Sequence, residues 1–225
     1  MIKKFEKKDY KYLLYFLYIP VYAIWFYAVE HTITTGYYVS HMYIDDIIPF
    51  CEYFYVFYFS WYFYLAVITV FLLLTDRDDF GKFMQFIIVG ATIGLIIFTV
   101  FPNGQDLRPS SFVRNNFFTR CIGLLYTIDT NTNVLPSLHV VGSFAGAVAI
   151  IKSKSLNKKI FPKIFVLFLC VLICLSTVFI KQHSFLDIIT GLIESILVYV
   201  FVYTNSIKFI FGVFCRKKRI KFKFY

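Results

Sequence analysis

The clearest shortage in this sequence is of charge. Only 16% of the 225 residues are Asp, Glu, Lys or Arg, whereas 59% are hydrophobic, and the mean hydropathy is +0.70. A soluble domain normally has about 25% charged residues. The composition therefore excludes an ordinary soluble domain and indicates an integral membrane protein.

Cysteine is scarce, and no two cysteines form a CxxC pair. The five are Cys51, Cys121, Cys170, Cys174 and Cys215. Cys170 and Cys174 lie one helical turn apart in an apolar stretch and are interpreted as small packing residues. A disulfide between Cys51 and Cys121 stays open as an alternative, because both fall near the same side of the membrane. Internal repeats and low-complexity linkers are absent, so we expect a single integral-membrane domain over residues 1–225.

Basic residues are almost missing from one set of connecting segments. Of the 23 Lys and Arg residues, all but four lie at the two ends of the chain, after the second apolar stretch or after the fourth. The four exceptions are Arg108, Arg114, Arg120 and Lys181. By the positive-inside rule, both termini are cytoplasmic and the four exceptions face outward.

This distribution also bears on partners. The net charge of +10 invites a nucleic-acid interpretation. Because the basic residues gather between and beyond apolar stretches, we expect them to lie against anionic lipid headgroups, and we expect no nucleic-acid partner.

Six long apolar stretches are present, and about 20 apolar residues suffice to cross a bilayer as a helix. They are 12–30, 53–75, 83–101, 134–151, 160–180 and 184–214. Long continuous runs favour helices over the short alternating segments of a membrane β-barrel. The sequence thus predicts an all-α membrane protein with six transmembrane helices in one bundle. No cleavage site follows the first stretch, which we expect to remain as an anchor.

The segment 31–52 has no Lys or Arg but contains acids and histidines. They are His31, His41, Asp45, Asp46 and Glu52. A metal site is an alternative, but the residues lack a regular ligand spacing. A solvated outer loop is the preferred interpretation, and we expect neither a metal nor another cofactor.

A first polar motif, Pro136-Ser137-Leu138-His139, stands at the start of the fourth apolar stretch. Proline fits the first turn of a helix, and Asn133 is placed to cap it. Such an N-terminus presents free N–H groups to an anion such as phosphate, and Ser137 adds a hydroxyl. His139 is close enough to reach a group bound there. A helix cap with an incidental histidine is the alternative.

A second motif pairs His183 with Asp187, four residues apart. On a helix these two residues share a face, so the carboxylate can accept one ring N–H and leave the other nitrogen as a nucleophile. A self-satisfying pair at a helix start is the alternative. With Arg108-Pro109, whose guanidinium suits phosphate oxygens, the two motifs form a set that faces outward.

Together these residues resemble the type 2 phosphatidic acid phosphatase superfamily, whose pattern is K-x6-R-P, then P-S-x-H, then S-R-x5-H-x3-D. Here Arg108-Pro109 and Pro136-Ser137-Leu138-His139 are followed by Ser176-Thr177, His183 and Asp187 with the same spacing. The resemblance covers about residues 102–191 and agrees with a six-span layout. Two departures stand out: the family Lys falls at Phe101 and the family Arg at Thr177. Lys181, Arg114 and Arg120 are candidate replacements.

The resemblance implies a membrane lipid phosphatase that works through a phosphohistidine. His183 is then the nucleophile, Asp187 orients it, and His139 acts as general acid and base. Arg108, Ser137 and Lys181 are the expected phosphate-binding residues. The site faces outward, in a multi-pass protein of a bacterial plasma membrane whose partners are the bilayer and a lipid phosphate.

Two alternatives to hydrolysis remain. The departures make the chain similar to the branch that includes inositol phosphorylceramide synthases, where a phospho-headgroup passes to a lipid alcohol. A non-enzymatic lipid transporter or a decayed relative is the third interpretation.

Overall fold

The structure is a computed structural model of the chain, and it describes residues 6–32 and 35–204. The α-helices are α1 (Tyr10–Leu13), α2 (Tyr18–Thr32), α3 (Tyr43–Ile47), α4 (Tyr55–Thr75), α5 (Arg77–Val100), α6 (Phe117–Ile128), α7 (Leu138–Lys152), α8 (Ile160–Phe179) and α9 (Phe185–Tyr203). Short 3-10 helices are η1 (Lys7–Asp9), η2 (Leu14–Leu17), η3 (Glu52–Phe54) and η4 (Lys154–Leu156), and the strands are β1 (Tyr38–Val39) and β2 (Asn103–Gly104). The basic residues of 1–5 and 205–225, with Cys215, lie outside the described part.

Within residues 6–32 and 35–204, five helical stretches are long and apolar enough to cross a membrane, against the six predicted over the whole chain. They are Tyr10–Thr32, Glu52–Thr75, Arg77–Val100, Ile160–Phe179 and Phe185–Tyr203. Large apolar side chains remain exposed on these helices, including Ile24 (71%), Val67 (66%) and Leu197 (64%). An exposed apolar surface of this extent suits contact with lipid. The chain is therefore mostly helical, with the surface of a membrane protein.

The fourth predicted span, 134–151, is helical only from Leu138. With 15 residues, α7 is about 22 Å long, which falls short of a hydrocarbon core of about 30 Å. It lies at the centre of the bundle against α4, α5, α8 and α9. A Cβ added to Gly142 would come within 2.9 Å of Trp61, so the glycine allows α4 to pack directly on α7. Burial within protein, rather than length, makes α7 part of the membrane bundle.

One further boundary differs from the sequence prediction, and another lies outside the described residues. Helix α5 begins six residues before the expected position 83, because the Asp76 side chain caps it by accepting the N–H groups of Asp78 and Asp79. Helix α9 is described to Tyr203, and the remainder of the predicted stretch 184–214 falls beyond residue 204.

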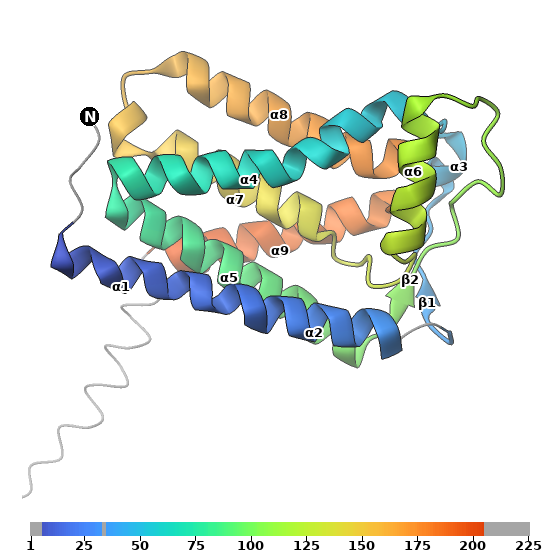
Figure 1. Cartoon of the computed structure of the whole chain (residues 1–225), viewed down its shortest axis with the longest axis horizontal. Helices are drawn as coiled ribbons and strands as arrows, with labels where there is room; N and C mark the ends of the chain where they lie inside the picture. Colours follow the sequence, from blue (N-terminus) through green and yellow to red (C-terminus); the bar gives the residue numbers. More distant parts are fainter. Residues whose placement is uncertain (1–5, 33–34, 205–225) are drawn as a thin grey trace, which may run out of the picture.

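Three connections that are distant in sequence meet at one end of the bundle. Figure 1 shows the segments between α2 and α4, between α5 and α7, and between α8 and α9 at the same end. There β1 and β2 pair in parallel, with Tyr38 opposite Asn103 and Val39 opposite Gly104. Helix α6 lies across this end (Figure 1), within a segment that the sequence presents as a polar loop. Both histidine motifs therefore lie at a common end of the molecule.

The acidic segment 31–52 is more ordered than the predicted outer loop, since it contains β1, α3 and the start of η3. Within residues 6–32 and 35–204, no group of three or more His, Cys, Asp and Glu is placed to hold a metal ion. Cys51 and Cys121 are both free thiols, so the disulfide alternative does not hold in this structure.

Candidate active site

The His139 ring lies in the first turn of α7 between two aromatic side chains of α4. Its centroid is 4.3 Å from that of Tyr58, in a stacked arrangement, and 4.5 Å from that of Trp61. The Nε2 atom is buried, and no described residue bonds to it. Burying a polar atom without a partner costs free energy. A ring held this rigidly, with one nitrogen unpaired, is available to a ligand.

His183 stands in the turn between α8 and α9. The sequence placed it on one helix with Asp187, but α9 begins at Phe185, so only Asp187 is helical. The contact still forms: Nδ1 lies 3.3 Å from Asp187 Oδ2 and 3.1 Å from the carbonyl oxygen of Val134. Both neighbours are acceptors, so we assign the proton of the neutral ring to Nδ1, which leaves the lone pair on Nε2.

The two histidine rings are close neighbours, with 5.8 Å between their centroids. Two contacts between α7 and α9 fix this spacing. The Ser137 N–H donates to the Asp187 carbonyl at 3.1 Å. Gly191 faces the Ser137 carbonyl so closely that a Cβ there would lie 2.9 Å from that oxygen. Helix packing thus joins the two motifs into one site.

Ser137 occupies the N-cap position of α7 but does not cap the helix. Its side chain makes no cap hydrogen bond, and its hydroxyl is buried without a partner in the described chain. Asn133, the predicted cap, instead has a left-handed backbone (φ 58°) and donates its amide to Glu30 at 2.7 Å. The first N–H groups of a helix lack intrahelical acceptors. Together with the free hydroxyl, they make this N-terminus suitable for an anion.

Arg108 lies next to the second motif, but most of its N–H groups donate hydrogen bonds to the protein itself. Nη1 donates to the carbonyl of Tyr126, and Nη2 contacts the carbonyls of Asp129 and Thr130 and the Gln182 side chain. Nε is buried without a partner among the described residues. Burial lowers the pKa of Arg108, and Asp129 opposes this shift. Arg108 therefore holds the end of α6 against the second motif, and its Nε–H is available to a ligand.

Lys181, a predicted phosphate-binding residue, lies beyond the end of α8. Helix α8 ends at Phe179, and Lys181 follows with a left-handed backbone (φ 55°). Its Nζ donates to the carbonyls of Asp45 and Ile48 at 2.7 and 2.6 Å. Burial lowers the pKa of this amine, and Asp45 opposes the shift. In this structure Lys181 anchors α3 rather than facing the histidines.

The two other candidate cations are occupied elsewhere. Arg114 pairs with Glu52, with Nε 2.8 Å from Oε1, and Arg120 donates to the Asn115 side chain. At the family's Arg position, Thr177 is fully buried, and its carbonyl accepts the N–H groups of Gln182 and His183. Neither arginine replaces the missing family cations here.

Two acids beside the site were not singled out by the sequence analysis. Glu30, on α2, is buried and accepts hydrogen bonds from Thr130 and Asn133. Asp129 accepts hydrogen bonds from Tyr58 and Gln182, each at 3.0 Å. Burial raises the pKa of Asp129, and Glu30 adds to this rise. An acid at the end of an apolar stretch, as at Glu30, is the signal that would have found them.

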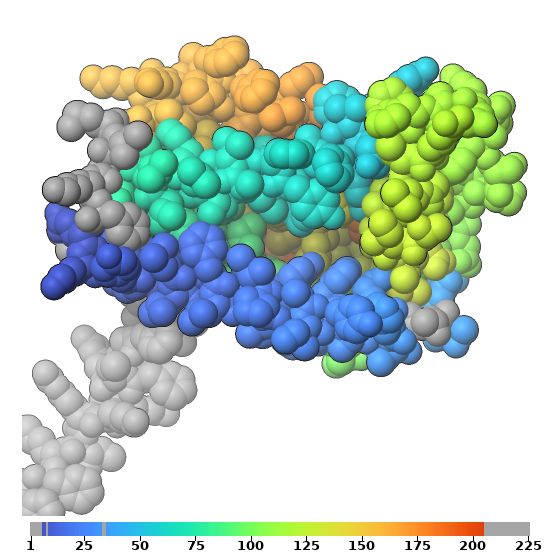
Figure 2. Space-filling model, viewed as in Figure 1, coloured from blue at the N-terminus to red at the C-terminus, as the bar shows by residue number. Residues whose placement is uncertain are grey.

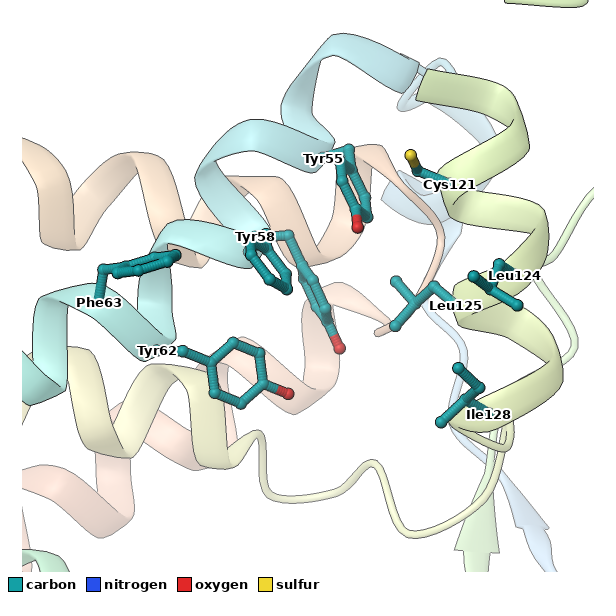
Figure 3. Close-up of a pocket in the computed structure, with 9 residues that line it drawn as sticks. Tyr55, Tyr58, Tyr62, Phe63, Cys121, Leu124, Leu125 and Ile128 are labelled. Atoms are coloured by element: carbon teal, nitrogen blue, oxygen red, sulfur yellow. The ribbon is translucent and has the colours of Figure 1, made fainter. Parts of the chain in front are cut away.

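An apolar cavity of about 440 Å³ adjoins the site between α4 and α6. It is lined by Tyr55, Tyr58, Phe59, Tyr62, Phe63, Cys121, Leu124, Leu125 and Ile128. Figure 2 shows the surface hollowed where α2, α4 and α6 approach each other. In Figure 3 the tyrosines of α4 face the aliphatic residues of α6. Tyr58 connects the cavity with the histidine site, since its ring lines the cavity and also stacks on His139.

Comparisons with known proteins agree with this geometry. The family model of the PAP2 superfamily matches residues 105–210, which include both histidine motifs and Arg108. Neither the curated proteins nor the solved structures contain a match to the chain. This match over residues 105–210 confirms the resemblance to the type 2 phosphatidic acid phosphatase superfamily.

Proposed function

We propose that this protein is a membrane phosphatase that hydrolyses a lipid phosphate or diphosphate through a phosphohistidine on His183. The observation that carries the proposal is the Nδ1 atom of His183, held 3.3 Å from Asp187 Oδ2 and 3.1 Å from the Val134 carbonyl. A ring oriented in this way presents Nε2 as a nucleophile and shares its developing positive charge with the carboxylate.

In the first step, Nε2 of His183 attacks phosphorus and the bond to the leaving oxygen breaks. His139 protonates that oxygen as general acid. Its unpaired Nε2 and its ring 5.8 Å from that of His183 support this role. In the second step, His139 removes a proton from water, which attacks phosphorus and releases phosphate from His183.

Charge on the phosphoryl oxygens is stabilised by a small set of donors. The hydroxyl of Ser137 and the Nε–H of Arg108 are buried and unpaired, so each gains a hydrogen bond when phosphate binds. The first N–H groups of α7 add to them. Lys181 is left out of this set, because its Nζ donates to the carbonyls of Asp45 and Ile48. No metal or other cofactor takes part in this scheme.

The lipid chain is assigned to the cavity between α4 and α6. Its apolar and aromatic lining accepts hydrocarbon, and Tyr58 places its inner end next to His139. The substrate phosphate then lies at headgroup level. We assign this level to the outer face of a bacterial plasma membrane, from the positive-inside distribution of basic residues.

Transfer of a phospho-headgroup to a lipid alcohol is the second candidate. It is favoured by the absence of the family cations at Phe101 and Thr177. Both reactions pass through the same phosphohistidine, so they differ only in the acceptor. A lipid transporter or decayed relative would form no phosphohistidine.

The test combines His183→Ala with a panel of lipid phosphates and diphosphates in detergent micelles, with products resolved by mass. We expect His183→Ala to abolish phosphate release and covalent labelling, because the attacking nitrogen is gone. His31→Ala, which removes an exposed histidine bonded only to its own helix, is the matched control and should keep full activity. Unchanged turnover in His183→Ala would refute the mechanism, whereas a new phospholipid product would select the transferase.

A further inference from the structure

The Asp187 carboxylate is completely buried, and a residue outside the family-matched segment holds one of its oxygens. Oδ2 accepts the Ser184 N–H at 2.8 Å and lies 3.3 Å from Nδ1 of His183. Oδ1 accepts the hydroxyl of Ser40 at 2.5 Å. Ser40 is itself fully buried and lies 147 residues before Asp187 in the chain.

Backbone pairing fixes Ser40 in place. It follows β1 directly, and its N–H donates to the Gly104 carbonyl at 2.7 Å. The pairing of β1 with β2 extends from Tyr38 to Val39. The Ser40 hydroxyl therefore approaches Asp187 from a rigid support, and a donor held in place loses little entropy when it bonds.

A second anchor from the same segment holds the turn that carries His183. Asp45 accepts the Ser184 hydroxyl and the Phe185 N–H at 2.5 and 2.8 Å, and its carbonyl receives Lys181. Asp45 is only 2% exposed. Segment 38–48 is thus hydrogen-bonded to the turn 181–187 on both sides of His183.

We propose that Ser40 is a positioning residue for the phosphoryl-transfer reaction: its hydroxyl holds Oδ1 of Asp187 so that Oδ2 faces Nδ1 of His183, and Asp45 fixes the turn between them. This inference rests on the proposed function, since it concerns the same nucleophile. Ser40 touches no reacting atom and acts through Asp187.

The expected consequence concerns rate rather than substrate binding. Without the hydroxyl, the carboxylate can rotate, and the fraction of His183 rings oriented for attack falls. Loss of a hydrogen bond to a charged group corresponds to about a tenfold to hundredfold change. We expect Ser40→Ala to lower kcat by that factor and to leave KM within about twofold, because no substrate contact is removed.

The experiment measures kcat, KM and thermal unfolding of wild type, Ser40→Ala, Ser40→Thr and Ser195→Ala on the best substrate of the lipid panel. Ser40→Thr keeps a hydroxyl and should retain more than half of wild-type kcat. Ser195→Ala is the matched control, since Ser195 is equally buried but bonds only to the Gly191 carbonyl of its own helix, and it should keep wild-type kinetics.

The outcomes separate the two proposals. Ser40→Ala that keeps wild-type kcat, that no longer folds, or that is no slower than Ser40→Thr would overturn the positioning role and leave the proposed function intact. A rise in KM that matches the fall in kcat would also overturn it. Wild-type protein without turnover on any lipid of the panel would overturn both proposals.

Discussion

The two histidine segments differ sharply in how their polar atoms are satisfied. In residues 133–139, three buried side-chain atoms lack a partner within the described chain: Oδ1 of Asn133, Oγ of Ser137 and Nε2 of His139. In residues 181–187, the side chains of Lys181, Gln182, Ser184 and Asp187 all make hydrogen bonds to other elements or to the turn itself.

This difference assigns distinct tasks to the two segments. Buried polar groups in proteins are normally paired, so unpaired ones at a site indicate where a ligand completes the set. The second segment is already complete and serves as a rigid frame for His183. Substitutions in the first segment should therefore affect turnover more than stability. Substitution of a frame residue whose side chain bonds only to α3 and its flanking segment, such as Lys181, should do the reverse.

The strongest test of this contrast is His139→Phe. A phenyl ring keeps the packing between Tyr58 and Trp61 but cannot transfer a proton. General acid–base catalysis contributes about a hundredfold to ten-thousandfold, so we expect kcat to fall by that factor. The thermal midpoint should stay equal or rise, because an unpaired buried nitrogen is removed. A large loss of stability would place His139 in the frame instead.

A smaller effect is expected from Ser137→Ala. The hydroxyl has no partner in the described chain, so its removal should not lower the thermal midpoint. If it donates to a phosphoryl oxygen, kcat/KM should fall by about tenfold to a hundredfold. Steady-state kinetics and an unfolding curve measured on one preparation decide this. Unchanged kcat/KM would remove Ser137 from the phosphate site.

Lys181→Met should produce the opposite pattern, with the smallest change in turnover. It leaves the carbonyls of Asp45 and Ile48 without their donor, which should destabilise the fold by about 1–3 kcal/mol. Turnover well below the midpoint should stay within about threefold of wild type. Lys158→Met, at an exposed lysine, is the control. Loss of turnover with unchanged stability would return Lys181 to the phosphate site.

The sequence was sufficient for features that depend on local pattern. Long apolar runs predicted five of the helices, and the motifs of His139, His183 and Asp187 lie within the segment that the family model matches. The sequence was insufficient for the roles of side chains whose partners are distant in the chain. The roles of Arg108 and Lys181 depend on carbonyl groups of distant residues, and no side-chain pattern reveals which carbonyl lies near which donor.

The predicted helix boundaries at the site were wrong for a related reason: side-chain hydrogen bonds, not spacing alone, decide where a helix starts. The i, i+4 spacing placed His183 and Asp187 on one helix, but Ser184 caps α9 by accepting the Leu186 N–H and so starts the helix after His183. Likewise Asn133 resembles a cap locally, yet Glu30 from α2 takes its amide. Competition from a distant partner outweighed the local preference in the second case.

The close approach at Gly191 means that the crossing of α7 and α9 sets the separation of the two histidine rings. Because α9 touches the Ser137 carbonyl there with no room for a side chain, a widening of the gap between α7 and α9 would pull the two imidazoles apart. The distance from His139 to His183 therefore depends on a contact between two backbones, Gly191 against the Ser137 carbonyl, inside the hydrophobic bundle. Under the proposed mechanism, we expect bilayer properties that change helix crossings, such as thickness and lateral pressure, to alter the distance between the His139 and His183 rings.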